Sequence, residues 1–228
     1  MPLRRRNLPN RAARNRRDKT AMQIDSIIFD LDGTLWDSVD EVILTWNRVL
    51  ARYPGLRGPI DRAEQESLMG LQMDEIARRL FPSEAPERQA ELLEECVQEE
   101  NRYLYLHGGR LYPDVERTLT VLHARYPLYI ISNCQSGYIE SFLHAHNLSG
   151  CFDGFLCFGD TGLSKGENIR KLISDKRLLH PVYIGDTLGD QESADFAGIP
   201  FIFASYGFGK PDHYAGIIRR FSDLAQWV

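Results

Sequence analysis

Short, continuous apolar runs, separated by segments with helical spacing, place the strongest constraint on the fold of this chain. The clear runs are residues 26–30, 128–132, 182–185 and 200–204, with 154–158 as a weaker fifth. Runs rich in Ile, Val, Phe and Tyr without polar alternation are typical of strands covered on both faces. Helical patterns lie between them, over 114–124, 138–146, 167–174 and 189–196. This alternation predicts an α/β fold with a doubly wound parallel sheet and right-handed crossovers.

The segment 38–110 interrupts the alternation. It holds no convincing strand, and its leucines and charged residues recur at helical spacing over 40–52, 73–81 and 86–105. We therefore expect a small all-helical domain over residues 38–110. It would be inserted after the first strand into a Rossmann-like core formed by residues 23–37 and 111–228.

The first 22 residues differ in character from the rest. Eight basic residues stand against one acid among the first 19, so the remainder of a chain with net charge −5 sums to −12. An arginine-rich arm can bind nucleic acid or an anionic membrane face, but blocks of like charge are more often solvated tails. We expect a disordered tail over residues 1–22. The acidic remainder argues against nucleic-acid binding by the folded body.

Composition narrows the class of protein further. With 43% hydrophobic and 26% charged residues, the chain is typical of soluble globular proteins. No run of about 18 apolar residues occurs, so no membrane helix is expected. The four cysteines form no CxxC pair and lack the histidine spacing of a zinc site. We expect reduced thiols and a cytoplasmic protein without a membrane partner; the oligomeric state is left open.

The first apolar run ends in two acids, within the sequence Ile-Ile-Phe-Asp-Leu-Asp-Gly-Thr-Leu at residues 27–35. On an extended strand, Asp30 and Asp32 would point to the same side, at the carboxyl edge where open α/β sheets bind ligands. Two carboxylates about 6–7 Å apart repel each other unless a cation lies between them. Mg²⁺ is a hard ion that prefers such oxygen ligands. The pair therefore predicts a magnesium site.

Further polar residues follow the other predicted strands. Asp186 and Asp190 come after the run 182–185, where an aspartate alone is often a helix N-cap. Ser132 and Asn133 close the run 128–132, and such a pair can hold phosphate oxygens or simply form a turn. Lys165 precedes a helical segment and by itself would be a surface lysine. Because Asp30 and Asp32 are also present, a shared metal and phosphate site is a better interpretation of these residues than caps and turns.

Together these segments resemble the haloacid dehalogenase superfamily over residues 23–228. Asp30-Leu31-Asp32-Gly33-Thr34-Leu35 matches its first motif, which is highly specific. Ser132 matches the second motif, Lys165 the third, and Gly185-Asp186-Thr187-Leu188-Gly189-Asp190 the fourth. The inserted helical segment looks like the helical cap of this superfamily.

One group within the superfamily fits best. Tyr112-Pro113-Asp114-Val115 resembles the segment that re-enters the core in phosphoglycolate-phosphatase-like members, where glycine is more usual than Asp114. The sequences Ala-Gly-Ile-Pro at 197–200 and Tyr-Gly-Phe-Gly at 206–209 are also similar to that group. The resemblance implies a magnesium-dependent phosphatase that acts on a small phosphorylated metabolite, either phosphoglycolate-like or a sugar phosphate.

The resemblance also implies a role for each motif residue. Asp30 would be the nucleophile that forms an aspartyl phosphate, and Asp32 the general acid and base. Mg²⁺ would be held by the Asp30 carboxylate, the Asp32 backbone carbonyl and the Asp186 carboxylate. Asp190 would act through a bound water or from outside the set of direct ligands. The transferred phosphate oxygens would be held by Ser132, Asn133 and Lys165.

Alternative functions are weighed on the same residues. Asp32, Asp186 and Asp190 argue against a metal-free dehalogenase. The absence of lysine from residues 38–110 argues against phosphonate cleavage through a cap Schiff base. A phosphosugar mutase shares the whole catalytic set and stays open. A non-catalytic regulator that binds Mg²⁺ and phosphate stays open too, although the intact Asp30 and Asp32 pair counts against it.

The helical segment offers candidates for substrate specificity. It holds nine arginines against fourteen acids, a balance that suits a small phosphoester better than a polyanion. Gly70 and Gln72, within Met-Gly-Leu-Gln at 69–72, are candidate specificity residues, although an ordinary turn between helices is an equal alternative. Trp36 and Trp46 could line the cleft, with packing at the hinge as the favoured role.

Overall fold

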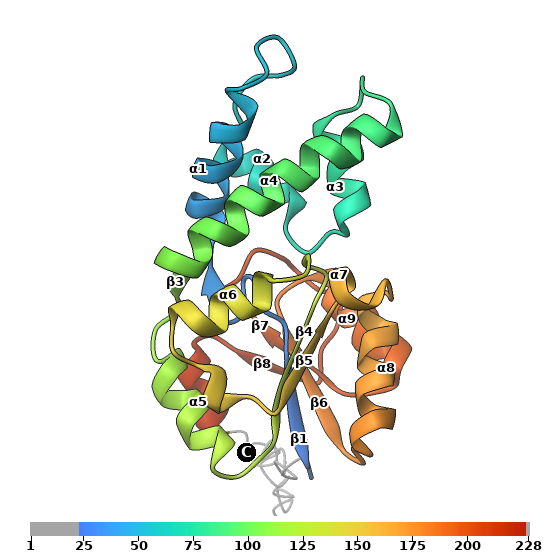
Figure 1. The fold of residues 1–228 in the computed structure, drawn as a ribbon. Helices are drawn as coiled ribbons and strands as arrows, with labels where there is room; N and C mark the ends of the chain where they lie inside the picture. The colour runs from blue at the N-terminus through green and yellow to red at the C-terminus, as the bar shows by residue number, and fades with distance from the viewer. Residues whose placement is uncertain (1–22, 227–228) are drawn as a thin grey trace, which may run out of the picture.

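The computed structural model describes residues 23–226 and contains a six-stranded sheet whose strands all run parallel (Figure 1). In spatial order they are β5 (Gly154–Cys157), β4 (Leu128–Ser132), β1 (Ser26–Phe29), β6 (Pro181–Gly185), β7 (Phe201–Ala204) and β8 (Gly216–Ile218). The predicted α/β fold with a doubly wound parallel sheet is confirmed. The sequence does not predict β8, because its three residues are recognisable as a strand only through pairing with β7.

Helices cover both faces of this sheet. One face packs against α5 (Val115–His123), α6 (Tyr138–Ala145) and the 3₁₀ helix η2 (Phe221–Gln226), and the other against α8 (Lys165–Lys176) and α9 (Leu188–Ala197). Short helices η1 (Ser149–Cys151) and α7 (Phe158–Thr161) lie in the connections. Along β1, Ile27 and Phe29 pack on the face covered by α5, α6 and η2, and Ile28 packs on the face covered by α8 and α9. All three are fully buried. Burial on both faces explains why the strand runs are continuously apolar.

A helical unit between β1 and β4 stands over the carboxyl edge of the sheet (Figure 1). Its helices are α1 (Val39–Leu50), α2 (Arg62–Leu68), α3 (Met73–Leu80) and α4 (Pro86–His107). They share a hydrophobic core of their own, which includes Trp46, Leu68 and Leu92. The sequence does not predict α2, which is only seven residues long and begins where the Asp61 carboxylate accepts from the Glu64 amide. We name this unit, residues 39–107, the cap.

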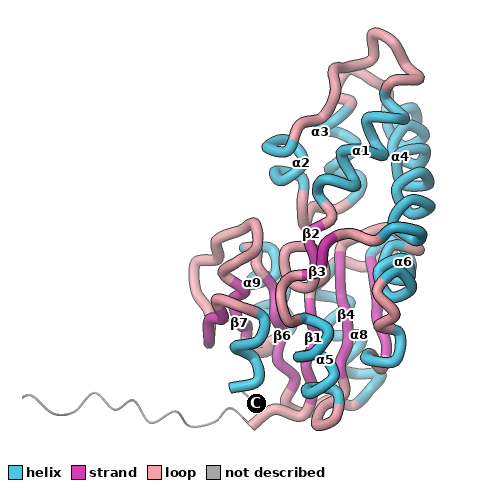
Figure 2. Tube along the Cα trace, turned by 90° about the vertical axis from the view of Figure 1, so that its left-hand side faces the viewer, coloured by secondary structure: helices cyan, strands magenta, loops and turns pink. Residues whose placement is uncertain are grey.

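A two-stranded antiparallel ladder joins the cap to the sheet (Figure 2). It consists of β2 (Trp36–Asp37) and β3 (Arg110–Leu111). The buried Asp37 carboxylate accepts hydrogen bonds from Arg110 at 2.8 Å and from Arg62 of α2 at 3.0 Å. These hydrogen bonds link the two segments that connect the cap to the sheet, both to each other and to the cap.

The expectations about membrane helices and cysteines can be compared with the structure, whereas the one about the basic tail cannot. No helix within residues 23–226 is both long and apolar enough to cross a bilayer. All four cysteines are free thiols. The predicted tail over residues 1–22 lies outside the described residues, so its proposed character, like the cytoplasmic setting, stays a prediction.

Candidate active site

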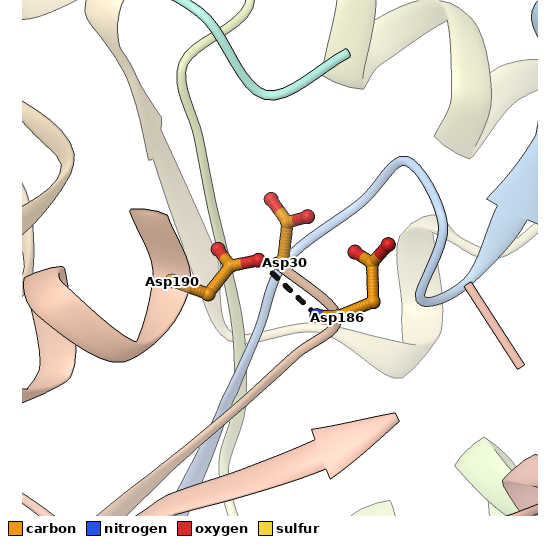
Figure 3. Close-up of side chains that lie close together, drawn as sticks. All are labelled: Asp30, Asp186 and Asp190. Atoms are coloured by element: carbon orange, nitrogen blue, oxygen red, sulfur yellow. Dashed lines mark hydrogen bonds between the residues drawn. The ribbon is translucent and has the colours of Figure 1, made fainter. Parts of the chain in front are cut away.

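Three carboxylates meet at the carboxyl edge of the sheet, two of them directly after β1 and β6 and the third on α9 (Figure 3). Because β1 pairs with β6, with Phe29 opposite Ile184, the residues that follow the two strands, Asp30 and Asp186, become neighbours. Asp190 joins them from the first turn of α9. One oxygen of each carboxylate lies within 4.8 Å of the others, and all three residues are buried. This is the topological switch point at which open α/β sheets bind ligands.

Two glycines make room for Asp186. Gly33 has φ 79°, in the left-handed region, and a Cβ atom there would lie 2.3 Å from Asp186 Oδ2. A Cβ atom on Gly207 would also lie 2.3 Å from that oxygen. The backbone amide of Phe208 donates to Asp186 Oδ2 at 2.6 Å, which orients the carboxylate. The turn after β1 and the loop after β7 therefore position this acid together.

Lys165 provides the positive charge in this cluster. It is the first residue of α8, whose N-cap Ser164 forms a capping box with Glu167. Its buried ammonium donates to Asp30 Oδ1 at 2.8 Å and to Asp190 Oδ1 at 2.7 Å. The sequence alone could place this lysine at the surface; the structure places it inside the site.

Burial and neighbouring charges shift the pKa values of the three acids. Burial, together with the charge of Asp190, raises the pKa of Asp30 to about 7 despite its contact with Lys165. Burial also raises the pKa of Asp186 well above its usual range. For Asp190, burial is outweighed by Lys165, and its pKa is lowered. The cluster gathers three buried carboxyl groups, two of which contact the Lys165 ammonium. An oxygen-preferring divalent cation such as Mg²⁺ fits this donor set.

Asp32 does not share this cluster through its side chain. Its Oδ1 atom accepts hydrogen bonds from Trp36 Nε1 at 2.9 Å, Ser38 Oγ at 2.9 Å and Tyr138 Oη at 2.8 Å. The Asp32 carboxylate is not one of the three that gather, although Asp30 and Asp32 line the same pocket. The role of its backbone carbonyl as a metal ligand stays a prediction. Its carboxylate faces the pocket described next.

A pocket lies between the carboxyl edge of the sheet and the cap. Ser132 and Asn133 line it together with Asp30 and Asp32. The Ser132 hydroxyl accepts from the Cys134 amide at 3.3 Å. The Asn133 side chain donates to the Gly70 carbonyl of the cap at 2.9 Å, while its Oδ1 atom is buried without a hydrogen-bond partner. Asn133 thus connects the core to the cap, a contact that its place after β4 does not reveal.

The two candidate specificity residues of the cap lie in different places. Gly70 lines the pocket with φ 80°, and a Cβ atom there would lie 3.6 Å from the Thr187 side chain. Gln72 lines a neighbouring open cleft beside the first turns of α8 and α9, which Gly70 also lines. The structure therefore brings Gly70, but not Gln72, to the pocket that contains Asp30.

Sequence reasoning missed a buried acid in the same pocket. Glu100 of α4 is 3% exposed, and its carboxylate accepts from Trp46 Nε1 at 2.5 Å and from Gln135 Nε2 at 3.2 Å. Burial raises its pKa to about 8. Nothing distinguishes this glutamate from its many acidic neighbours on α4 in the sequence. Trp36 and Trp46, both expected to pack at the hinge, are buried, and Trp46 also lines the pocket.

Comparison with known proteins identifies the family. A family model described as haloacid dehalogenase-like hydrolase matches residues 27–204, which is most of the chain. The chain therefore belongs to the haloacid dehalogenase-like hydrolase family.

Individual relatives narrow the position within that family. The phosphoglycolate phosphatase of Aliivibrio fischeri is 29% identical over 203 residues, covering 82% of this chain and 88% of the relative. That of Synechococcus elongatus is 30% identical over 189 residues, covering 81% and 85%. A haloacid dehalogenase-like hydrolase of Streptococcus pneumoniae shares the fold, with a TM-score of 0.75 at 22% identity over 90% of this chain and 98% of that one. The predicted membership in the phosphoglycolate-phosphatase-like group, and with it the phosphatase class of enzyme, is confirmed.

Proposed function

We propose that this phosphatase hydrolyses a small phosphate monoester with Mg²⁺ as cofactor, through a phosphorylated Asp30. The observation that carries the proposal is the buried cluster of Asp30, Asp186 and Asp190 around the Lys165 ammonium. Such a cluster is costly to bury unless a cation and an anionic ligand complete it.

Asp30 is the proposed nucleophile. One of its carboxylate oxygens attacks phosphorus, the bond to the ester oxygen breaks, and an aspartyl phosphate forms. Lys165, 2.8 Å from Asp30, offsets the repulsion between this carboxylate and a phosphate dianion. The Ser132 hydroxyl and the Asn133 backbone amide would hold the transferred oxygens, and both residues line the pocket that contains Asp30. Asp30, Asp186 and the backbone carbonyl of Asp32 would hold Mg²⁺, with Asp190 supporting them, and the ion would supply further positive charge to offset that of the phosphate.

Asp32 is the proposed general acid and base. It protonates the departing oxygen and later takes a proton from the water that hydrolyses the aspartyl phosphate. Burial raises its pKa, although three hydrogen bonds oppose the shift, and this favours a proton on Asp32 before the first step. Because Tyr138, Ser38 and Trp36 hold Oδ1, we assign proton exchange to Oδ2.

The experiment that tests this proposal follows phosphate transfer to the protein. Wild type should hydrolyse an aryl phosphate in the presence of Mg²⁺, and Asp30→Asn should reduce turnover to background because the attacking carboxylate is gone. Asp175→Asn, which alters an exposed carboxylate of α8, is the matched control and should keep wild-type turnover. Substantial turnover by Asp30→Asn would rule out the covalent route. Wild type that binds Mg²⁺ and phosphate but turns over no phosphoester would favour the regulator instead.

A further inference from the structure

Three donors from different parts of the chain converge on one carboxylate oxygen, Asp32 Oδ1. Trp36 of β2 and Ser38, the N-cap residue of α1, each donate at 2.9 Å from positions four and six residues along the chain. Tyr138, the first residue of α6, donates at 2.8 Å from a position 106 residues away. All three donors are buried. Rotation of the Asp32 carboxyl group would therefore leave buried donors without their acceptor, which is costly.

The hydroxyls of Tyr138 and Ser38 also contact each other, at 2.7 Å. Together with Asp32 Oδ1 they form a closed triangle of oxygen atoms. Each hydroxyl carries one hydrogen, so Tyr138 donates either to Asp32 directly or to Ser38, whose own hydrogen then goes to Asp32. In both arrangements the Tyr138 hydroxyl stabilises the same orientation of the Asp32 carboxyl group.

Tyr138 is itself held in a defined position. Its ring packs edge-on against Trp36, with 5.5 Å between the ring centroids and 71° between the ring planes. The turn before it is fixed by Asn101 of the cap helix α4, whose Nδ2 donates to the Ser136 carbonyl at 2.8 Å. Gly137 in this turn has φ 85°, and a Cβ atom there would lie 3.0 Å from Asn101 Nδ2. The hydroxyl therefore reaches its acceptor from a preorganised setting.

We propose that Tyr138 is a positioning residue for the proton transfers of the proposed reaction. Its hydroxyl holds the Asp32 carboxyl group so that Oδ2 gives a proton to the departing ester oxygen and later takes one from water. The inference rests on the proposed function and adds to it a residue that acts only through Asp32. Because Tyr138 and Asp32 line the same pocket, the test must separate positioning of Asp32 from direct substrate binding and from support of the fold.

The first test is Tyr138→Phe, which removes the hydroxyl and keeps the ring. With Mg²⁺ present, kcat for ethyl phosphate should fall about tenfold, because the proton donor loses one of the hydrogen bonds that orient it. For an aryl phosphate with an acidic phenol, which needs little protonation, kcat should fall only about threefold. Tyr214→Phe, which alters an exposed tyrosine between β7 and β8, is the matched control and should keep wild-type kcat on both esters. A KM raised on both esters by Tyr138→Phe would assign Tyr138 to substrate binding and overturn the inference.

A double-mutant cycle with Asp32→Asn decides whether Tyr138 acts through Asp32. The aryl phosphate is used, because Asp32→Asn should still turn it over. Tyr138→Phe should cause its loss of about threefold in the wild-type background and no further loss in the Asp32→Asn background, where no carboxyl proton is left to position. The same loss in both backgrounds would overturn the inference.

Ser38→Ala tests the triangle without altering the Tyr138 ring. It removes the hydroxyl through which Tyr138 can also reach Asp32, so it should reproduce the larger loss on ethyl phosphate than on the aryl phosphate. Equal losses on the two esters would contradict the role of the triangle.

A binding measurement separates positioning from structural support. Because the Asp32 carboxylate lies outside the three-acid cluster, Tyr138→Phe should bind Mg²⁺ with wild-type affinity in a calorimetric titration. Weakened Mg²⁺ binding together with equal losses of kcat on both esters would show that Tyr138 only supports the fold, and would overturn the inference. Additive losses in the cycle, with Asp30→Asn inactive, would refute the positioning role alone. Wild type that turns over no phosphoester would refute the proposed function and this inference with it.

Discussion

The Lys165 ammonium lies 2.8 Å from Asp30 Oδ1, although 135 residues separate the two in the chain. It also lies 2.7 Å from Asp190 Oδ1, so a single ammonium links Asp30, the proposed nucleophile, to Asp190. Both acids and the lysine are nearly inaccessible to solvent. In such surroundings the ion pairs are mutually dependent, since loss of one partner leaves an uncompensated buried charge.

Replacing this lysine should therefore affect stability as well as catalysis. Lys165→Met should lower the free energy of unfolding by about 3–5 kcal/mol and reduce kcat/KM by about a hundredfold or more. Urea denaturation and initial rates on an aryl phosphate measure the two effects. Lys171→Met, which removes an exposed lysine of the same helix, is the control and should change neither much. A Lys165→Met protein with wild-type rates would show that the ammonium is not part of the phosphate site.

Magnesium should stabilise the folded protein. Binding to the three-acid cluster relieves repulsion that the unfolded chain does not have, so Tm should rise with Mg²⁺ concentration and activity should vanish in excess chelator. Differential scanning fluorimetry of wild type and Asp186→Asn checks this. The variant should lose most of the Mg²⁺-dependent rise in Tm. Full activity in chelator would contradict the proposed cofactor.

The room left by Gly207 should be necessary for the metal site. A Cβ atom there would lie 2.3 Å from Asp186 Oδ2, so Gly207→Ala must displace that carboxylate or its loop. We expect weaker Mg²⁺ binding and a kcat/KM lowered by about tenfold or more. Gly150→Ala is the matched control, because a Cβ atom at Gly150 meets nothing within 4 Å. Calorimetric titration with Mg²⁺ should find its affinity unchanged.

Glu100 should make stability depend on pH. Burial raises its pKa from 4.5 to about 8 in the folded protein, so between these values the folded state binds more protons than the unfolded one. The free energy of unfolding contributed by this group therefore falls as pH rises from 4.5 through 8. Glu100→Gln should remove that part of the slope. Between about pH 5 and pH 8.5, the free energy of unfolding of wild type should therefore decrease relative to that of the variant. Denaturation curves with parallel pH dependence for both proteins would refute the assignment.

Asp32→Asn should reveal its role through the leaving group. The variant keeps the nucleophile but has no proton to donate, so an alkyl phosphate, which needs protonation, should lose more activity than an aryl phosphate with an acidic phenol. Comparing kcat for the two substrates measures this. When the reaction of this variant with a phosphoryl-labelled aryl phosphate is stopped with acid, the protein should carry labelled phosphate on Asp30. The base that helps water to hydrolyse the aspartyl phosphate is absent. Equal losses on both substrates would argue against Asp32 as the proton donor.

Sequence alone determined the layered architecture and the positions of the acids along the chain. Continuous apolar runs indicate strands covered on both faces, and helical spacing between them implies parallel crossovers. Asp30 and Asp186 directly follow such runs, so parallel pairing alone brings them to the same edge of the sheet. These are consequences of local periodicity, and local periodicity is readable in a single sequence.

Only the tertiary structure decided where the side chains point and what they meet. The Asp32 carboxylate accepts a hydrogen bond from Tyr138, 106 residues away in the chain. Lys165 is buried rather than exposed because α8 begins beside both Asp30 and Asp190. Glu100 lines the pocket because α4 packs against α6, and Gln135 of the core donates a hydrogen bond to it. Each of these outcomes depends on contacts between distant segments, and a local sequence pattern carries no record of which distant segment will supply a partner.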